Sequence, residues 1–195
     1  MKSLNKYITE KFQVSKNNIR TYNYYPETTD ELIDCIKEKI EKEGLGTKDK
    51  PLDLNDIDTS KITDMSNLFN NFGSYGIKLK RLSKNGYFDI SDWNVSNVKN
   101  MHTMFYESSF DGDLSDWDVS NVEDMCDMFA YSDFTGKNGS ISGWDVRNVE
   151  DMEGMFYSSG FNGDLSDWDV RNVKYMDSMF NNSPLKNNPP KWYEK

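Results

Sequence analysis

The pattern of hydrophobic and polar positions changes its period every few residues, and the same change recurs along most of the chain. Residues 112–129, "GDLSDWDVSNVEDMCDMF", and residues 163–180, "GDLSDWDVRNVKYMDSMF", are two nearly identical copies of this unit. Around Phe110, in residues 110–117, "FDGDLSDW", Phe110, Gly112 and Leu114 alternate with Asp111, Asp113 and Ser115. This alternation predicts a half-buried strand.

The second half of the unit has a longer apolar period. Val122, Met125, Met128 and Phe129 fall at positions i, i+3, i+6 and i+7. This spacing predicts a short helical segment or one or two 3₁₀ turns. Each unit therefore predicts a short strand, a corner and a short helical segment.

The tryptophans set the length of the repeat. Trp93, Trp117, Trp144, Trp168 and Trp192 are spaced by 24, 27, 24 and 24 residues. An earlier, degenerate copy has Ile57 in the tryptophan position, and a 12-residue insertion separates it from the next copy. We expect repeats near residues 52–88, 89–112, 113–139, 140–163 and 164–187, followed by a C-terminal remnant at 188–195.

A unit of about 24 residues cannot bury its own apolar face, but it can do so when it is stacked on similar neighbours. We therefore expect an α/β solenoid with coils about 4.8 Å apart along a parallel sheet, in which identical residues form rows. The expected tryptophan row consists of Trp93, Trp117, Trp144 and Trp168. The expected asparagine row, with buried amides that bond backbone groups of their own and neighbouring coils, consists of Asn97, Asn121, Asn148 and Asn172. We favour this structural interpretation of the asparagines over a binding role.

Residues 1–50 do not repeat, and they predict a small α+β cap made of a helix, a strand and a second helix. Leu4, Ile8 and Phe12 have helical spacing. The second helix opens with a capping box, Thr28 to Glu31. Because the first apolar edge of a solenoid must be covered, we interpret this segment as a structural cap rather than as a separate functional domain.

The unit "DLSxWDVSNVxxMxxMF" resembles the repeat of BspA-type leucine-rich-repeat proteins, in particular the bacterial and Mycoplasma lipoprotein subset with "WDVSNVTNMSGMF"-like units. The resemblance covers residues 52–183, about two thirds of the chain. It implies a right-handed, leucine-rich-repeat-like solenoid and a surface or adhesion-like protein. This sequence shows neither a lipobox nor a secretion signal. Similar short proteins without a secretion signal occur in phage-like genomes.

The charge of the chain is strongly acidic and unevenly distributed. The net charge is -10, with +2 in residues 1–86 and -12 in residues 87–195. Such a surface repels phosphate backbones, so we expect no direct binding to nucleic acid or to an anionic membrane. Cys35 and Cys126 lack metal or redox spacing and are expected to be free thiols. These features favour a cytoplasmic protein, unless a signal peptide preceded the sequence, in which case the surface is the expected location.

Candidate catalytic groups are few. His102 is the one histidine, and neither a catalytic triad nor a phosphate-binding glycine loop can be assembled. We therefore expect no enzymatic activity and no cofactor. Aspartates that recur from unit to unit raise the alternative of a calcium site, but their spacing matches neither an EF-hand loop nor the glycine-rich calcium roll. A solvated acidic face is the favoured interpretation, and no metal site is expected.

The same acidic rows would attract a protein partner with a basic surface. Two insertions, at residues 70–86 and 133–140, interrupt the repeat on one face and could either bind a partner or dock on the acidic array. Tyrosines near this edge would be good anchors or simple wall packing. The candidate partner-binding residues are Asp92, Asp111, Asp113, Asp116, Asp118, Asp164, Asp167 and Asp169, the basic residues Lys78, Lys80, Arg81 and Lys84, and the tyrosines Tyr75, Tyr106, Tyr131 and Tyr157.

These observations favour a non-enzymatic protein-binding scaffold. One specific form of this hypothesis is a phage-encoded inhibitor of a bacterial defence protein, whose basic nucleic-acid channel the acidic rows would occupy. The alternative is a bacterial surface adhesin or lipoprotein module that binds host components. A homo-oligomer formed through an open solenoid edge is a further expectation that the sequence leaves open.

Overall fold

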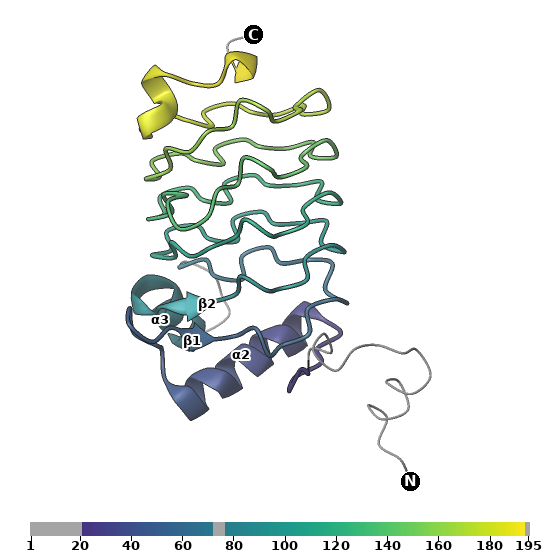
Figure 1. Cartoon of the computed structure of the whole chain (residues 1–195), viewed down its shortest axis with the longest axis vertical. Helices are drawn as coiled ribbons and strands as arrows, with labels where there is room; N and C mark the ends of the chain where they lie inside the picture. Colours follow the sequence, from purple (N-terminus) through teal and green to yellow (C-terminus); the bar gives the residue numbers. More distant parts are fainter. Residues whose placement is uncertain (1–20, 72–76, 194–195) are drawn as a thin grey trace.

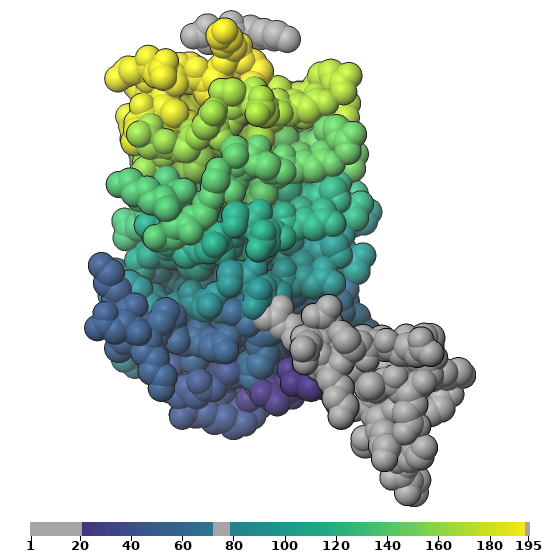
Figure 2. Space-filling view, in the orientation of Figure 1, coloured from purple at the N-terminus to yellow at the C-terminus, as the bar shows by residue number. Residues whose placement is uncertain are grey.

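A computed structural model describes residues 21–71 and 77–193 of the chain. Successive turns of the chain lie on top of one another along the long axis of the molecule (Figure 1). Figure 2 shows the same arrangement as bands of successive colour that cross the long axis. The N-terminal helix lies across one end of this stack, and the C-terminal residues lie at the other end.

Among the described residues, helices and strands occur only before residue 90 and after residue 183. The elements are α2 (Thr29–Glu43), β1 (Leu52–Asp53), α3 (Ile77–Asn85), β2 (Phe88–Asp89), η1 (Pro184–Asn187) and η2 (Lys191–Tyr193). Strands β1 and β2 pair in parallel, with Leu52 opposite Phe88 and Asp53 opposite Asp89. Helix α3 belongs to the first insertion and contacts α2.

Between these elements, a ladder of isolated parallel bridges joins one coil to the next. The bridges connect, in order, Asp64, Asn100, Asp124, Asp151 and Tyr175. Beside each bridge, N–H groups of one coil donate to carbonyl groups of the following coil, as in Met125 to Asp151 at 2.9 Å and Phe129 to Met155 at 2.9 Å. Five consecutive units are therefore hydrogen-bonded in a common register.

The predicted strand from Phe110 to Trp117 is not formed, and the predicted helical segment is a series of turns instead. Tight backbone hydrogen bonds join residues three apart, from Trp117 to Leu114 and from Met128 to Met125. Because the two ends of a four-residue turn are also three residues apart, turns reproduce the apolar spacing that predicted a helix. With a corner every few residues, the coils after β2 form isolated bridges rather than strands.

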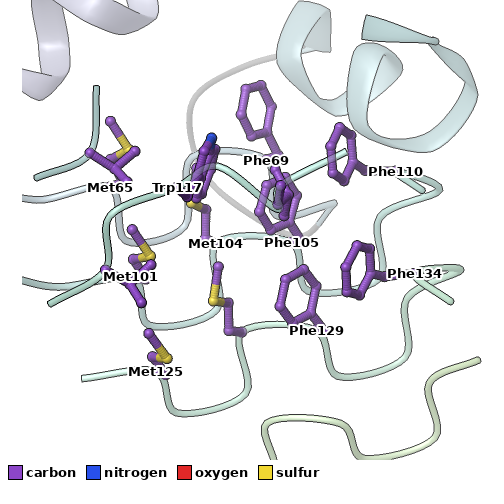
Figure 3. Close-up of a cluster of buried hydrophobic side chains, with 14 of the residues drawn as sticks. Met65, Phe69, Met101, Met104, Phe105, Phe110, Trp117, Met125, Phe129 and Phe134 are labelled. Atoms are coloured by element: carbon purple, nitrogen blue, oxygen red, sulfur yellow. The ribbon is translucent and has the colours of Figure 1, made fainter. Parts of the chain in front are cut away.

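The interior of the stack consists of columns of identical side chains. Figure 3 shows Met65, Met101 and Met125 in one column and Phe105 and Phe129 in another, with Met104 between the two. The phenyl rings of Phe105 and Phe129 stack with centroids 5.3 Å apart and planes 1° apart. Stacking of such rings adds to the free energy gained from their burial. The apolar core of the molecule therefore runs without a break from coil to coil.

The tryptophan column adds a hydrogen bond to each step. Each indole Nε1 donates to a backbone carbonyl oxygen of the preceding coil, as Trp93 does to Leu54 at 2.9 Å and Trp144 to Leu114 at 3.0 Å. Trp168 donates in the same way to Ile141 at 3.0 Å. A buried indole requires such a partner. The tryptophans therefore bury apolar area and also satisfy carbonyl groups that the turns leave free.

Helix α2 covers the first coil. Its N-cap, Thr28, accepts a hydrogen bond from the Glu31 N–H, and Gly44 ends the helix with φ +87°. The helix buries Leu32 and Ile36 completely. Lys39 is only 5% exposed and forms salt bridges with a carboxylate of the same helix and with one of the first coil. The predicted first helix of the cap, with Leu4, Ile8 and Phe12, lies outside the described residues.

The last coil is covered on one side only. Trp192 of η2 continues the tryptophan column and donates to the carbonyl oxygen of Leu165 at 2.7 Å. Val170 is partly buried, whereas its counterpart in the preceding coil, Val146, is 1% exposed. Tyr175 is 56% exposed. The described residues therefore leave part of this end open.

Candidate protein-binding surface

Aspartate side chains form the corners of the coils. Asp113 Oδ1 accepts a hydrogen bond from the N–H of Ser115 at 2.9 Å, and Asp118 Oδ1 accepts one from the N–H of Ser120 at 3.1 Å. The same aspartate-to-i+2 bond recurs in the other coils, at Asp53, Asp58, Asp64, Asp89, Asp124, Asp145, Asp151, Asp164 and Asp169. These Asx turns fix the direction of the chain without a helix or strand. The recurring aspartates thus have a structural role that the sequence interpretation missed, although the spacing Asp-x-Ser was its signal.

In each coil, one segment runs from one aspartate corner to the next. These segments lie one above another and form one side of the stack. We call this surface the aspartate face and define it as the segments 53–58, 89–94, 113–118, 140–145 and 164–169. These segments contain twelve aspartates and no lysine or arginine. Their members are Asp53, Asp56, Asp58, Asp89, Asp92, Asp113, Asp116, Asp118, Asp145, Asp164, Asp167 and Asp169. None of these side chains is buried.

Basic side chains from neighbouring segments neutralise only part of this face. Arg147 binds Asp145 with its guanidinium Nε and Nη2, and Arg171 binds Asp169 in the same way. These bonds hold the pKa of both carboxyl groups below the ordinary value. Hydrogen bonds from Ser166 lower the pKa of Asp164. Hydrogen bonding therefore favours the charged form of these three carboxyl groups.

Two predicted partner-binding aspartates remain accessible on this face. Asp116 and Asp167 are exposed, and their side chains form no hydrogen bond or ion pair with the described residues. Asp92 is exposed at the same position of an earlier coil. Asp111 is different, because it is engaged by the second insertion. Its carboxylate accepts hydrogen bonds from the Thr135 N–H at 2.7 Å and the Thr135 hydroxyl at 2.9 Å. Asp111 therefore fastens the insertion to the stack.

The predicted tyrosines lie on another side of the coils. Tyr131 contacts Tyr106 with ring centroids 5.5 Å apart and Tyr157 with centroids 5.2 Å apart. Tyr131 is 48% exposed. Tyr75 lies outside the described residues. The structure therefore brings three of the four tyrosines together, away from the aspartate face.

The basic residues of the first insertion lie on helix α3. Lys80, Arg81 and Lys84 are exposed there. The side chain of Lys78 lies outside the described part of the structure. The buried Ser83 ties the helix to the stack, because its hydroxyl donates to the Phe69 carbonyl oxygen and its carbonyl oxygen accepts from the Ser109 N–H. The insertion therefore packs on the coils through α3.

The predicted asparagine row forms hydrogen bonds between coils, but it is exposed rather than buried. Asn97, Asn121, Asn148 and Asn172 each donate Nδ2 to a backbone carbonyl oxygen of the preceding coil, at 2.6–2.8 Å. All four residues are exposed. The prediction of burial was wrong because the corner places the amide along the outside of the stack, where it bridges two coils at the surface.

Few of the described side chains have catalytic potential. His102 and Cys126 are half-buried in the turn segments of successive coils. Burial, with nearby carboxylates, raises the pKa of the Cys126 thiol to about 12, and burial also raises the pKa of Cys35. Thiols with raised pKa values are poor nucleophiles and poor metal ligands. Among the residues that the structure describes, no three His, Cys, Asp or Glu side chains are placed to hold a metal ion.

A cleft that the sequence interpretation did not identify lies beside Tyr131. Its lining includes Asn71, Lys84, Glu107 and Asp133. Only Lys84 and Tyr131 were among the predicted residues. The sequence gives little indication of Asn71, Glu107 and Asp133 as cleft residues. The cleft forms only where the first insertion packs on the coils. No helix within the described ranges is long and apolar enough to cross a membrane.

The chain matches a protein-family model described as "Mycoplasma protein of unknown function, DUF285" over residues 43–130 and 77–192. Together these ranges span most of the chain, and the protein belongs to this family. The two matched ranges overlap, as a repeated unit can produce. No match was found among curated proteins or among solved structures. The narrower BspA-type resemblance stays a prediction.

Proposed function

We propose that the protein is a non-enzymatic scaffold that binds a protein partner with a basic surface, and that the aspartate face is the contact surface. The observation that carries this proposal is a continuous face with twelve aspartates and no basic residue in its own segments. Such a face speeds the association with a basic partner and disfavours nucleic acid and anionic lipid.

The rigidity of the face supports the same proposal. The corner aspartates are held by their own Asx turns, so their carboxylates are fixed before a partner arrives. Asp116 and Asp167 lie between such corners and keep their carboxylates available. A preorganised surface loses little conformational entropy on binding, which favours affinity. The stacked coils thus fix the distances between the negative charges of the aspartate face.

A variant pair tests the proposal once a partner has been captured from the native host and purified. Asp116→Asn/Asp167→Asn removes two charges from the aspartate face. Glu153→Gln/Asp177→Asn removes two exposed charges elsewhere and is the matched control. We expect the first variant to weaken binding about tenfold and the control to bind like the wild type. Raising the salt concentration should weaken wild-type binding. Equal affinities of the two variants, or salt-independent binding, would overturn the proposal.

A narrower form of the proposal is an inhibitor that occupies the nucleic-acid channel of its target, such as a phage-encoded inhibitor of a bacterial defence protein. Its support is the charge of the aspartate face, because rows of carboxylates can take the place of phosphates in a basic channel. This form predicts that the partner's own nucleic acid competes with the protein. A partner that binds both at once would rule out the inhibitor and leave the scaffold.

A further inference from the structure

One column of the stack brings an unusual set of side chains together. The Asn71 N–H donates to the Tyr106 carbonyl oxygen at 3.0 Å, and the Glu107 N–H donates to the Ala130 carbonyl oxygen at 2.9 Å. The Tyr131 N–H continues the ladder into the next coil. Asn71, Glu107 and Tyr131 are therefore equivalent positions of three consecutive coils, and they line one cleft.

The side-chain oxygen of Asn71 accepts no hydrogen bond from the described residues. Asn71 is 7% exposed, and its Oδ1 atom is buried with no hydrogen-bond donor in the described structure. A buried acceptor of this kind is costly and rare in native proteins. Because Asn71 lines the cleft, a ligand whose N–H displaced the atoms covering this oxygen would remove the cost.

Tyr131 is strained and yet not buried. Its φ is +56°, in the left-handed region that a bulky residue seldom adopts. The equivalent residues Glu107, Ser158 and Asn182 share this conformation, and they are of types that tolerate it better or are smaller. Tyr131 is 48% exposed, and its ring contacts those of Tyr106 and Tyr157. Observed strain of this kind is a basis for inferring function.

The remaining lining residues set the charge of the cleft. Glu107 and Asp133 are negative, Lys84 is positive, and the lining therefore carries a net charge of -1. Asp133 is held beside Glu107 by a hydrogen bond from its N–H to the Ser108 carbonyl oxygen at 3.0 Å. The cleft thus offers two carboxylates, one unsatisfied amide oxygen and one aromatic face.

We propose that this cleft binds an arginine side chain of a protein partner. A guanidinium group has five N–H donors in a planar fork and no acceptor, so it can bind a carboxylate and reach the Asn71 oxygen together. Its flat face stacks on an aromatic ring, here that of Tyr131. A lysine ammonium is a compact point charge and fits this spread of acceptors less well. The cleft shares no residue with the aspartate face, so it stands independently of the function proposed above.

The test uses the full chain and a defined probe. The ¹⁵N-labelled protein is titrated with N-acetyl-arginine amide, and amide shifts are followed by NMR. The lysine and citrulline analogues are the controls, because citrulline keeps the planar shape without the charge. We expect saturable shifts at Asn71, Glu107 and Tyr131, and binding at least about tenfold weaker for both analogues. No saturable shift at the cleft, or equal binding of all three probes, would overturn the proposal.

One variant separates binding from folding. Tyr131→Asn places at this position the residue type that Asn182 has at the equivalent position with φ +58°. We expect this variant to melt at the same or a higher temperature and to lose arginine binding about tenfold or more, since asparagine tolerates the conformation but has no aromatic face. The variant Glu153→Gln, outside the cleft, should bind the probe like the wild type. Undiminished binding by Tyr131→Asn would also overturn the proposal.

Discussion

The indole Nε1 of Trp117 donates a hydrogen bond of 3.1 Å to the carbonyl oxygen of Ile90, which lies one coil earlier in the stack. Trp117 is 3% exposed. The same relationship recurs at every step of the tryptophan column, up to Trp192. One side chain thus satisfies a neighbouring coil's backbone and fills the space between the coils, which explains why the tryptophan recurs at a nearly constant spacing.

Removal of Trp117 should therefore be strongly destabilising. Trp117→Ala leaves a cavity in the middle of the stack and an unsatisfied carbonyl group, and we expect a loss of about 3–5 kcal/mol in the free energy of unfolding. Denaturant unfolding monitored by circular dichroism measures the loss. Trp192→Ala, at the partly covered end, is the control and should cost less. A loss below about 1 kcal/mol for Trp117→Ala would contradict the role of the column.

Two neighbouring aspartates of one coil should behave in opposite ways. Asp118 accepts the Ser120 N–H in an Asx turn, whereas the Asp116 side chain bonds no described residue. We expect Asp118→Ala to destabilise the protein by about 1 kcal/mol and Asp116→Ala to change stability by less than about 0.5 kcal/mol. Thermal melting of the two variants, which carry the same net charge, makes the comparison. Equal losses would show that the Asx turns do not stabilise the corners.

The positions of the recurring side chains were easier to predict from the sequence than the local conformation of the backbone. Identical residues at a fixed period must meet when units are stacked, and Phe105 and Phe129 do so. The local conformation was mispredicted because the i, i+3 spacing of Met125 and Met128 is shared by a helix turn and a four-residue turn. The positive φ of Asp127, +52°, belongs to the turn. Aspartate tolerates this conformation better than most residues, but its presence alone does not predict a turn.

The surface was harder to predict than the core. The acidic rows were evident from the sequence, but the use of Asp113 and Asp118 as corner caps depends on backbone groups that only the folded coil brings into reach. The cleft at Tyr131 was missed for a related reason. It forms where Asn71 of one coil meets Glu107 and Tyr131 of the next two, and these residues are far apart in the sequence.

The carboxyl group of Asp127 should oppose folding at neutral pH. Burial raises its pKa above the ordinary value, and Glu153 and Asp151 add to this effect while His102 opposes it. An acid whose pKa is raised by folding stabilises the folded state while it is protonated, and this contribution is lost as the pH rises through the raised pKa. The folded chain leaves little room there, because a Cβ on Gly154 would lie 2.2 Å from Asp127 Oδ1.

Asp127→Asn removes this ionisation at nearly constant size. We expect the variant to gain stability relative to the wild type at pH 7, and the gain to shrink as the pH falls below the raised pKa. Melting temperatures of both proteins between pH 3 and pH 7, values chosen to bracket the ordinary pKa of about 4, measure the difference. Asp116→Asn, at an exposed site, should show no such pH-dependent gain. A gain that does not change with pH would contradict the effect.

The open end of the stack presents backbone donors without acceptors. In the preceding coil, the Met152 N–H donates to Tyr175 at 2.8 Å and the Phe156 N–H to Met179 at 3.0 Å. The corresponding N–H groups of the last coil, at Met176 and Phe180, have no acceptor among the described residues. The same edge also presents a carbonyl acceptor. The Lys174 N–H donates to the Glu150 carbonyl oxygen at 2.8 Å, and the corresponding oxygen of the last coil, that of Lys174, receives no backbone donor among the described residues.

Because Trp192 and Tyr193 of η2 cover part of this end, we expect the protein to be a monomer, despite the exposed Tyr175 and partly buried Val170. Stacking the open end of one copy on the first coil of another is also disfavoured, because α2 covers that coil. Light scattering after size-exclusion chromatography, over concentrations from about 1 μM to 1 mM, should give a constant monomer mass. A dimer that forms with rising concentration and is abolished by Tyr175→Glu would contradict this expectation. Since a charge at Tyr175 lies outside the tryptophan column, that variant should keep the wild-type fold.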